Sequence, residues 1–421
     1  MPVETVEGAP AAGSGEFRTH WRALVGCTLA AAIGTIGLNA YSQGAFVPML
    51  VAQAGYSREQ LSLATLVLSA TIALLAPLVG ALLDRWGPAP IIAACVVGEA
   101  VGFAFLGLAP AQFHWFLGGM VLLGVLGVGT TPPSFSRVIA ARFDRNRGLA
   151  LGLMICGLGL VAITAPIVMT RVLAAVGWRC GYLTLAAAVL VLGGAGLWLI
   201  RRDPAPARRD AGAGVVMARR GDWSALKRPL FWYLLVCFAA PALFGGGYLL
   251  HMITILRAKG FTPGEAAQVQ ALIGVAVVVG RFSSGFAMDR VFAPFVAATT
   301  FAISAAGCAM LFSDSGLLLS LGALAIGLTI GAELDILAYV ASRYFGLDSF
   351  GRLYSLAYSA MILAGGASPL LIAKLAPNGD YGRALVVSTI GTAAAALLVT
   401  MLPRFQPAPM TLAAEPSPIR P

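Results

Sequence analysis

The chain has 421 residues, of which 59% are hydrophobic and only 11% are charged. Water-soluble proteins usually carry about 25% charged residues, so a soluble globule of this composition would lack polar groups to cover its surface. The composition therefore argues against a soluble enzyme and, despite a net charge of +10, against a protein that binds nucleic acid. The basic excess is better explained by loops that face anionic lipid at one membrane surface.

Apolar runs long enough to cross a bilayer recur along the chain, each near the ~20 residues that a membrane-spanning helix needs. Six runs precede a central polar segment and six follow it, which predicts an all-α membrane protein with twelve transmembrane helices in two six-helix bundles. The predicted spans are 22–48, 57–83, 89–109, 114–137, 147–173, 178–200, 229–256, 264–288, 291–313, 317–343, 352–376 and 382–403.

The polar segments divide the chain into five parts. The first twenty residues lack the basic start and the short apolar core of a signal peptide, so we expect a disordered tail there. The central segment is rich in Arg, Ala, Gly and Pro and is expected to be a linker. The expected parts are a cytosolic tail at 1–20, an N-terminal bundle at 21–200, a cytosolic linker at 201–228, a C-terminal bundle at 229–403 and a cytosolic tail at 404–421.

The basic residues predict how the chain is oriented in the membrane. Of the 28 Lys and Arg residues, twenty lie in loops on the side of the termini, seven lie on the opposite side, and Arg281 lies inside a span. Lys and Arg accumulate in the cytoplasmic loops of membrane proteins. We therefore expect a multi-pass protein of the plasma membrane (the inner membrane of a bacterium) with both termini in the cytoplasm.

The two halves share a short motif at the same point. Gly80–Arg85 reads G-A-L-L-D-R and closes the second predicted span, and Gly285–Arg290 reads G-F-A-M-D-R and closes the eighth. Asp84 and Asp289 are 205 residues apart, about half the chain. A motif of this kind that occurs twice, in register with two six-helix halves, indicates an internal repeat.

These features resemble the major facilitator superfamily over essentially the whole chain. Three segments are similar to its monocarboxylate and oxalate/formate transporter branch: Arg147–Gly152 entering span five, Gly280–Gly285 in span eight, and Arg343–Gly346 leaving span ten. One departure is Pro88-Ala89-Pro90, which stands where basic residues normally follow the first motif. The resemblance implies cytosolic gating contacts that stabilise an outward-open state, made by Gly80, Asp84, Arg85, Gly285, Asp289 and Arg290 together with Arg142 and Arg147.

Four ionisable residues lie inside predicted spans, where a charge costs at least ~2.5–3.5 kcal/mol. Arg281 and Asp335 each lie eight residues before the cytosolic end of their span, about 12 Å deep, so they are candidates to interact. Glu333 projects to nearly the opposite side of the helix from Asp335. We expect Asp335 to face the pathway and Glu333 to need a buried hydrogen-bond partner. Glu99, midway along span three, is interpreted as a structural carboxyl, with a proton relay as the alternative.

Arg281 is the strongest candidate for contact with a substrate. In the transporters that the sequence resembles, an arginine at this point binds the substrate carboxylate, and a guanidinium offers that group a planar, bidentate match. The alternative is a permanent ion pair with Asp335 that holds spans eight and ten together. The oxalate transporters have a second cation in span eleven, where this chain has Tyr358. One fixed positive charge suits a monoanion better than a dianion.

Other polar residues in the spans are weaker candidates, because such residues as often join one helix to another. His251, near the outer end of span seven, is interpreted as interfacial. The residues that could hydrogen-bond a substrate are Asn39, Tyr41, Gln43, Thr130, Thr131, Ser134, Tyr248, His251, Tyr354, Tyr358 and Ser359.

Together these features predict a secondary active transporter, not an enzyme. We expect it to move a small organic monocarboxylate with a proton by alternating access, with Asp335 or Glu333 as the proton carrier. The alternatives are proton-driven efflux of an amphipathic compound or drug, and a non-transporting sensor or scaffold. No nucleotide loop or metal-ligand cluster is recognised, so neither a cofactor nor a metal is expected, and the six cysteines are interpreted as core residues. The expected partners are the substrate anion, protons and the lipid bilayer, without nucleic acid, and the protein is expected to act as a monomer.

Overall fold

The computed structural model describes residues 14–143, 146–203, 226–288, 290–377 and 379–405, and the regular elements in these ranges are all helical. The first half begins with a span made of two helices, followed by two single-helix spans. The fourth span is again broken in the middle. The elements are α1 (Ser14–Ala32), α2 (Thr35–Met49), α3 (Arg58–Trp86), α4 (Pro88–Leu108), α5 (Phe113–Gly127), α6 (Pro132–Ala140), α7 (Arg147–Ala188) and α8 (Gly194–Arg202), with short turns at Leu50–Ala54, Val128–Thr130 and Val189–Gly193.

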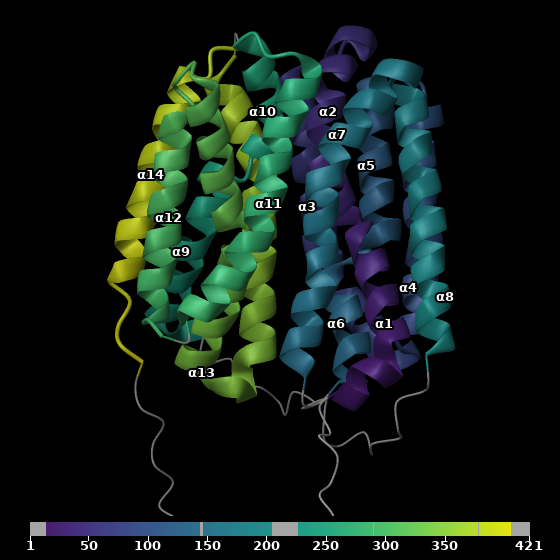
Figure 1. Ribbon diagram of the computed structural model, residues 1–421, viewed down its shortest axis with the longest axis vertical. Helices are drawn as coiled ribbons and strands as arrows, with labels where there is room; N and C mark the ends of the chain where they lie inside the picture. Colours follow the sequence, from purple (N-terminus) through teal and green to yellow (C-terminus); the bar gives the residue numbers. More distant parts are fainter. Residues whose placement is uncertain (1–13, 144–145, 204–225, 289, 378, 406–421) are drawn as a thin grey trace, which may run out of the picture.

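The second half repeats this plan with longer continuous helices. Its elements are α9 (Pro229–Gly245), α10 (Tyr248–Ala258), α11 (Pro263–Met288), α12 (Ala293–Met310), α13 (Gly316–Leu375) and α14 (Gly382–Thr400). The 60-residue α13 contains two separate apolar stretches, Gly316–Phe345 and Leu356–Leu375. Figure 1 shows that it turns back between them, so that it supplies two spans.

One further long helical segment, Leu149–Arg202, supplies two spans. Ten segments of the described chain are long and apolar enough to cross a membrane, and the pair α1–α2, bent by 41°, adds an eleventh. Leu149–Arg202 has 54 residues, about 80 Å of helix, which is more than twice the thickness of the hydrocarbon core. Gly177, with a φ of 77°, breaks this segment, so it crosses twice. The predicted twelve spans are thereby confirmed.

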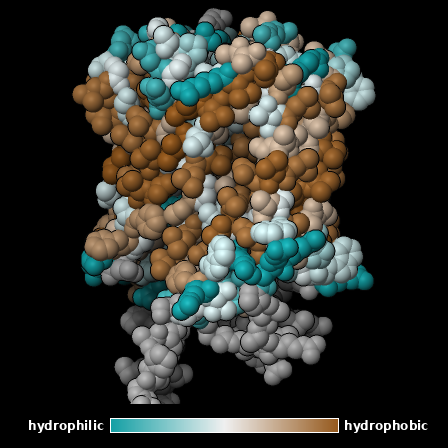
Figure 2. All heavy atoms as spheres, turned by 45° about the vertical axis from the view of Figure 1, so that its right-hand side comes forward, coloured by the Kyte–Doolittle hydropathy of each residue, from teal (hydrophilic) through white to brown (hydrophobic). Residues whose placement is uncertain are grey.

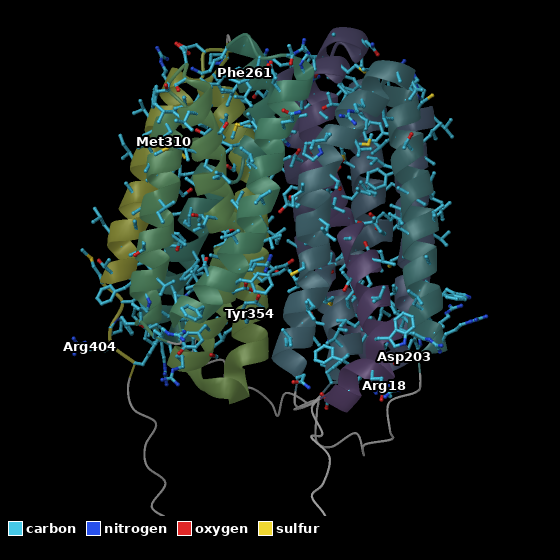
Figure 3. All side chains as sticks on the ribbon, viewed as in Figure 1. Arg18, Asp203, Phe261, Met310, Tyr354 and Arg404 are labelled. Carbon is cyan, nitrogen blue, oxygen red and sulfur yellow. The ribbon has the colours of Figure 1, made fainter. Side chains whose placement is uncertain are left out.

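The helices form two bundles that stand side by side (Figure 1), α1–α8 in one and α9–α14 in the other. Arg18, Asp203 and Arg404 lie at one end of the molecule, and Phe261 lies at the other (Figure 3). We call the end with Arg18 and Arg404 the terminal side. Apolar side chains form a band around the middle, with hydrophilic side chains at both ends (Figure 2). This band matches the bilayer that the composition required.

The bundles touch in the half of the molecule opposite the terminal side. There Gly274 of α11 lies against the backbone of Ala162 and Ile163 of α7, and Gly159 lies against Val278. Gly152 lies seven residues before Gly159 on α7, and Gly285 lies seven residues after Val278 on α11, both toward the terminal side. A Cβ at either position would meet nothing within 4 Å. On the terminal side, α7 and α11 therefore have space around Gly152 and Gly285, and we call this space the terminal-side opening.

The N-terminal tail is shorter than expected, because residues 14–20 belong to α1. Side-chain contacts hold this segment in place. Phe17 packs on Phe143 with ring centroids 5.2 Å apart, and Glu16 accepts a hydrogen bond from the backbone N–H of Asn146. Such tertiary contacts are not visible in local composition. Of the remaining tail and linker predictions, residues 1–13, 204–225 and 406–421 lie outside the described residues.

Candidate functional site

Arg281 of α11 and Asp335 of α13 form an ion pair halfway through the membrane. Nη1 of Arg281 donates to both carboxylate oxygens of Asp335, at 3.2 and 3.3 Å. Nε of Arg281 is buried and has no hydrogen-bond partner. The pair thus uses one edge of the guanidinium and leaves another N–H free for a further acceptor.

The ion pair can be reached from the terminal-side opening. Arg281 lies about one helical turn beyond Val278, which lies against Gly159 of the other bundle. The side chain of Asp335 is 35% exposed and that of Arg281 is 15% exposed. Because a charge facing lipid at this depth is strongly unfavourable, this exposed surface faces the opening. The structure therefore shows the ion pair formed and partly exposed, and both roles of Arg281, contact with substrate and a permanent pair with Asp335, stay open.

Five further side chains surround Arg281 within the range of its charge. From the C-terminal bundle these are Glu333, Tyr354 and Tyr358 of α13, and the two tyrosine rings lie 6.3 Å apart. From the N-terminal bundle they are Tyr41 of α2 and Cys156 of α7. The site therefore combines one cation, two carboxyl groups and three phenols, with both bundles contributing.

Glu333 lies within electrostatic range of both Arg281 and Tyr41 and is partly buried. The side chain to which Arg281 donates hydrogen bonds is that of Asp335, so the expectation that Asp335 faces the pathway stays a prediction. Cys156 was assigned to the core by composition and was missed, since only the packing of α7 on α11 brings it near Arg281.

Several predicted substrate contacts are buried. Asn39 and Gln43 are buried and bonded to each other, and Thr65 also donates to Gln43 at 3.0 Å. Tyr248 is fully buried inside the C-terminal bundle. The hydroxyl of Thr131 donates to the Val128 carbonyl of its own span.

Ser359 and Glu99, two further candidates, differ in their burial. Ser359 follows Tyr358 on α13 and is partly exposed. Glu99 is fully buried in the N-terminal bundle, where its Oε2 accepts a hydrogen bond from Thr130 at 2.7 Å. It is not among the groups that surround Arg281.

His251 is fully buried, which corrects its assignment to the membrane interface. Its Nε2 lies 3.0 Å from the carbonyl oxygen of Pro369 and 3.4 Å from the hydroxyl of Ser62, and its Nδ1 lies 3.3 Å from the hydroxyl of Tyr381. Ser62 belongs to the N-terminal bundle and the other partners to the C-terminal bundle. His251 thus joins the bundles on the closed side of the molecule.

The predicted gating residues lie at the open end and bond within their own bundles. Arg142 donates from Nε to the buried Asp203 at 2.8 Å, and Gly80 accepts from Arg137 at 3.0 Å. Arg85 lies over the Trp86 ring, and Arg290 lies over Phe286 while it donates to the Phe286 carbonyl. Gly285 faces open space. Asp289 and the side chains of Asp84 and Arg147 lie outside the described residues.

The fold is similar to solved structures of transporters, and the sequence is similar to that of a monocarboxylate transporter. The solved structure of a D-xylose-proton symporter superposes with a TM-score of 0.70 at 16% identity and covers 92% of this chain and 98% of its own. A bacterial homologue of the human lysosomal transporter Spinster, in an inward-facing and occupied conformation, gives 0.66 at 19% identity over 90% and 96%. Monocarboxylate transporter 11 of Mus musculus is 26% identical over 351 residues, 79% of this chain and 76% of that protein.

The family assignment rests on a match over most of the chain. The family model described as Major Facilitator Superfamily matches residues 29–369, which include most of both bundles and all the residues around Arg281. The family is one of transporters, and the twelve helical spans in two bundles agree with its fold. The chain is a multi-pass membrane protein that belongs to the Major Facilitator Superfamily.

Proposed function

We propose that the protein is a secondary active transporter that moves a small organic monocarboxylate together with a proton. The observation that carries the proposal is the partly exposed Arg281–Asp335 pair beside the terminal-side opening, in which the buried Nε of Arg281 has no partner. A substrate carboxylate would accept from this N–H, since charge-assisted hydrogen bonds to a guanidinium are strong and directional. The likeness to a monocarboxylate transporter supports the same substrate class.

A charge count links the substrate to a proton. Arg281 supplies one positive charge, and Asp335 and Glu333 supply up to two negative charges. A poorly solvated site is most stable when its charges balance. Without substrate, the balance requires one protonated carboxyl, and with a bound monoanion it requires two. Binding of one anion therefore takes up one proton, which makes the coupled movement electroneutral.

The single positive charge of Arg281 favours substrates that carry one negative charge. Around Arg281 the described residues provide no second Lys or Arg, and Tyr358 contributes a neutral phenol. A dianion would keep one unbalanced charge, or would need a further proton, so we infer that monoanions are preferred. The tyrosine hydroxyls are suited to hydrogen-bond a second polar group of the substrate.

The substrate class is tested by a thermal-shift screen of mono- and dicarboxylates on the purified protein, repeated with Arg281→Ala. Bound ligand stabilises the native state by mass action. We expect monocarboxylates to raise the melting temperature of the wild type but not of Arg281→Ala. Equal stabilisation of both proteins would refute the site. Stabilisation by uncharged amphipathic compounds alone would favour the alternative, proton-driven efflux.

Coupling is tested in proteoliposomes with the carboxylate found in the screen. A pH gradient should drive its accumulation, whereas a membrane potential imposed without a pH gradient should not. Accumulation that follows the potential would contradict the charge count. We further propose cytoplasmic termini in a bacterial inner membrane and action as a monomer, which protease protection and cross-linking in native membranes would test.

A further inference from the structure

A second buried carboxyl lies in the N-terminal bundle and has no role in the proposed transport site. Glu99 of α4 is fully buried, and its Oε1 has no hydrogen-bond partner. Among the described residues no Lys, Arg or His forms an ion pair with it. An ionised carboxylate in such a place would be strongly unfavourable. The surroundings of Glu99 therefore have to supply a neutralising ligand.

Glu99 lies where two broken helices meet. Span one is interrupted between α1 and α2, and span four is interrupted between α5 and α6. At this point Gly34 lies so close to the Thr130 carbonyl that a side chain would not fit. The free N–H of Thr35, in the first turn of α2, donates to the Thr130 hydroxyl at 3.1 Å. Thr130 thus caps α2 from another helix.

Counting hydrogens in this cluster reveals one too few. The Thr130 hydroxyl lies 2.7 Å from Glu99 Oε2 and 2.7 Å from the Gly127 carbonyl oxygen, but it has a single hydrogen. The hydroxyl of Thr35 donates to the same Gly127 carbonyl at 3.0 Å. If Glu99 were ionised, one of the two short contacts of Thr130 would join two oxygens without a hydrogen between them.

One added hydrogen satisfies both short contacts of Thr130, and only the longer approach of the Thr35 and Thr130 hydroxyl oxygens, at 3.1 Å, then lies without a hydrogen of its own. With a proton on Oε2, Glu99 donates to the Thr130 hydroxyl, which in turn donates to the Gly127 carbonyl and also accepts from the N–H of Thr35. Thr130 then makes one donated and two accepted hydrogen bonds, the full capacity of a hydroxyl. The remaining Oε1 is a neutral carbonyl oxygen, which is far cheaper to bury without a partner than a carboxylate oxygen.

We propose that Glu99 is a proton-binding site that holds the breaks of spans one and four together. The Thr130 hydroxyl bonds to its carboxyl, Thr35 lies beside them, and the titratable group next to Glu99 is the thiol of Cys95 on its own helix. The 41° bend between α1 and α2 lies at this cluster, and α2 carries Tyr41 to Arg281. The proton on Glu99 thereby stabilises the bend that completes the transport site. This site is separate from the proton carried by Asp335 or Glu333 and does not depend on the proposed substrate.

Infrared difference spectroscopy tests the proposal directly. A protonated carboxyl has a C=O stretching band that ionised carboxylates and amides lack, and this band shifts in D₂O. At neutral pH we expect the wild type and Asp335→Asn to show a band that Glu99→Gln has lost, with little change in the melting temperature of Glu99→Gln, because the amide can donate to Thr130 as the acid does. Identical wild-type and Glu99→Gln spectra in this region would overturn the proposal.

Substitutions of Thr130 and a sodium-binding measurement provide two further tests. Thr130→Val removes the acceptor of the proposed acid hydrogen bond and should shift the Glu99 band to higher frequency, whereas Thr130→Ser should leave it in place. This comparison serves also if Glu99→Gln does not fold. Sodium is the competing ligand: if NaCl but not choline chloride raised the melting temperature of the wild type, and Glu99→Gln abolished the effect, the site would hold sodium and the proposal would be wrong.

Discussion

Replacing Arg281 with lysine separates the charge of the guanidinium from its shape. Lysine keeps the positive charge, so the charge balance with Asp335 and Glu333 is unchanged. It has no equivalent of the Nε–H that is left without a partner beside the Asp335 contact. If the substrate carboxylate binds to that N–H, Arg281→Lys removes one charge-assisted hydrogen bond from the bound state alone.

The size of the effect follows from the value of one such bond. A hydrogen bond to a charged group contributes about 1.5–3 kcal/mol. Since 1.4 kcal/mol corresponds to a tenfold change in affinity, the dissociation constant should rise about 10- to 150-fold. The melting temperature without ligand should change little, because the ammonium group can still pair with Asp335.

Isothermal titration calorimetry with the best-bound monocarboxylate measures this change. Arg257→Lys is the matched control, because Arg257 is exposed on the side opposite the termini and the substitution is the same. It should bind like the wild type. If Arg281→Lys also bound like the wild type, only the net charge of the site would matter, and the proposed contact at Nε would be refuted.

Three further perturbations test other parts of the mechanism. Asp335→Asn combined with Glu333→Gln leaves no carboxyl to take up a proton, so it should reduce pH-driven accumulation by more than tenfold yet preserve exchange of preloaded substrate in proteoliposomes; loss of both activities would argue against a coupling role. Gly274→Val places a side chain against the backbone of the other bundle and should destabilise the closed side by about 1–3 kcal/mol, lowering the melting temperature. Gly152→Cys with Gly285→Cys, in a background without native cysteines, should form a disulfide only when the bundles close on the terminal side. Rapid cross-linking in the purified, ligand-free protein would show that the opening is not its resting state.

Hydropathy predicted the twelve spans because burial in lipid is a property of each segment alone. The boundaries between spans five and six, and between ten and eleven, were less visible in the structure than in the sequence. In α7 the chain stays helical on both sides of Gly177, and α13 is continuous over 60 residues. The break at Gly177 and the turn of α13 between its two apolar stretches (Figure 1) separate these spans within helices that are otherwise continuous.

Depth along the chain also indicated which charges meet. Arg281 and Asp335 were expected at equal depth, and the structure pairs them at 3.2 Å. Depth does not give direction around the helix, so the orientation of Glu333 stays a prediction. Contacts such as Thr35 with Thr130 join residues 95 positions apart, and no local pattern predicts them. The polar residues of spans one and four therefore looked like substrate contacts, although several of them join helices.

The distribution of charge between the bundles explains how the site could survive a rocking motion. Arg281, Asp335 and Glu333 all belong to the C-terminal bundle, and the N-terminal bundle contributes the neutral Tyr41 and Cys156. Breaking a buried ion pair by removing one partner costs about 3–5 kcal/mol. Because the charged partners move as one body, the bundles can separate on either side without that cost. The charge balance then changes only when a substrate anion and a proton enter or leave together.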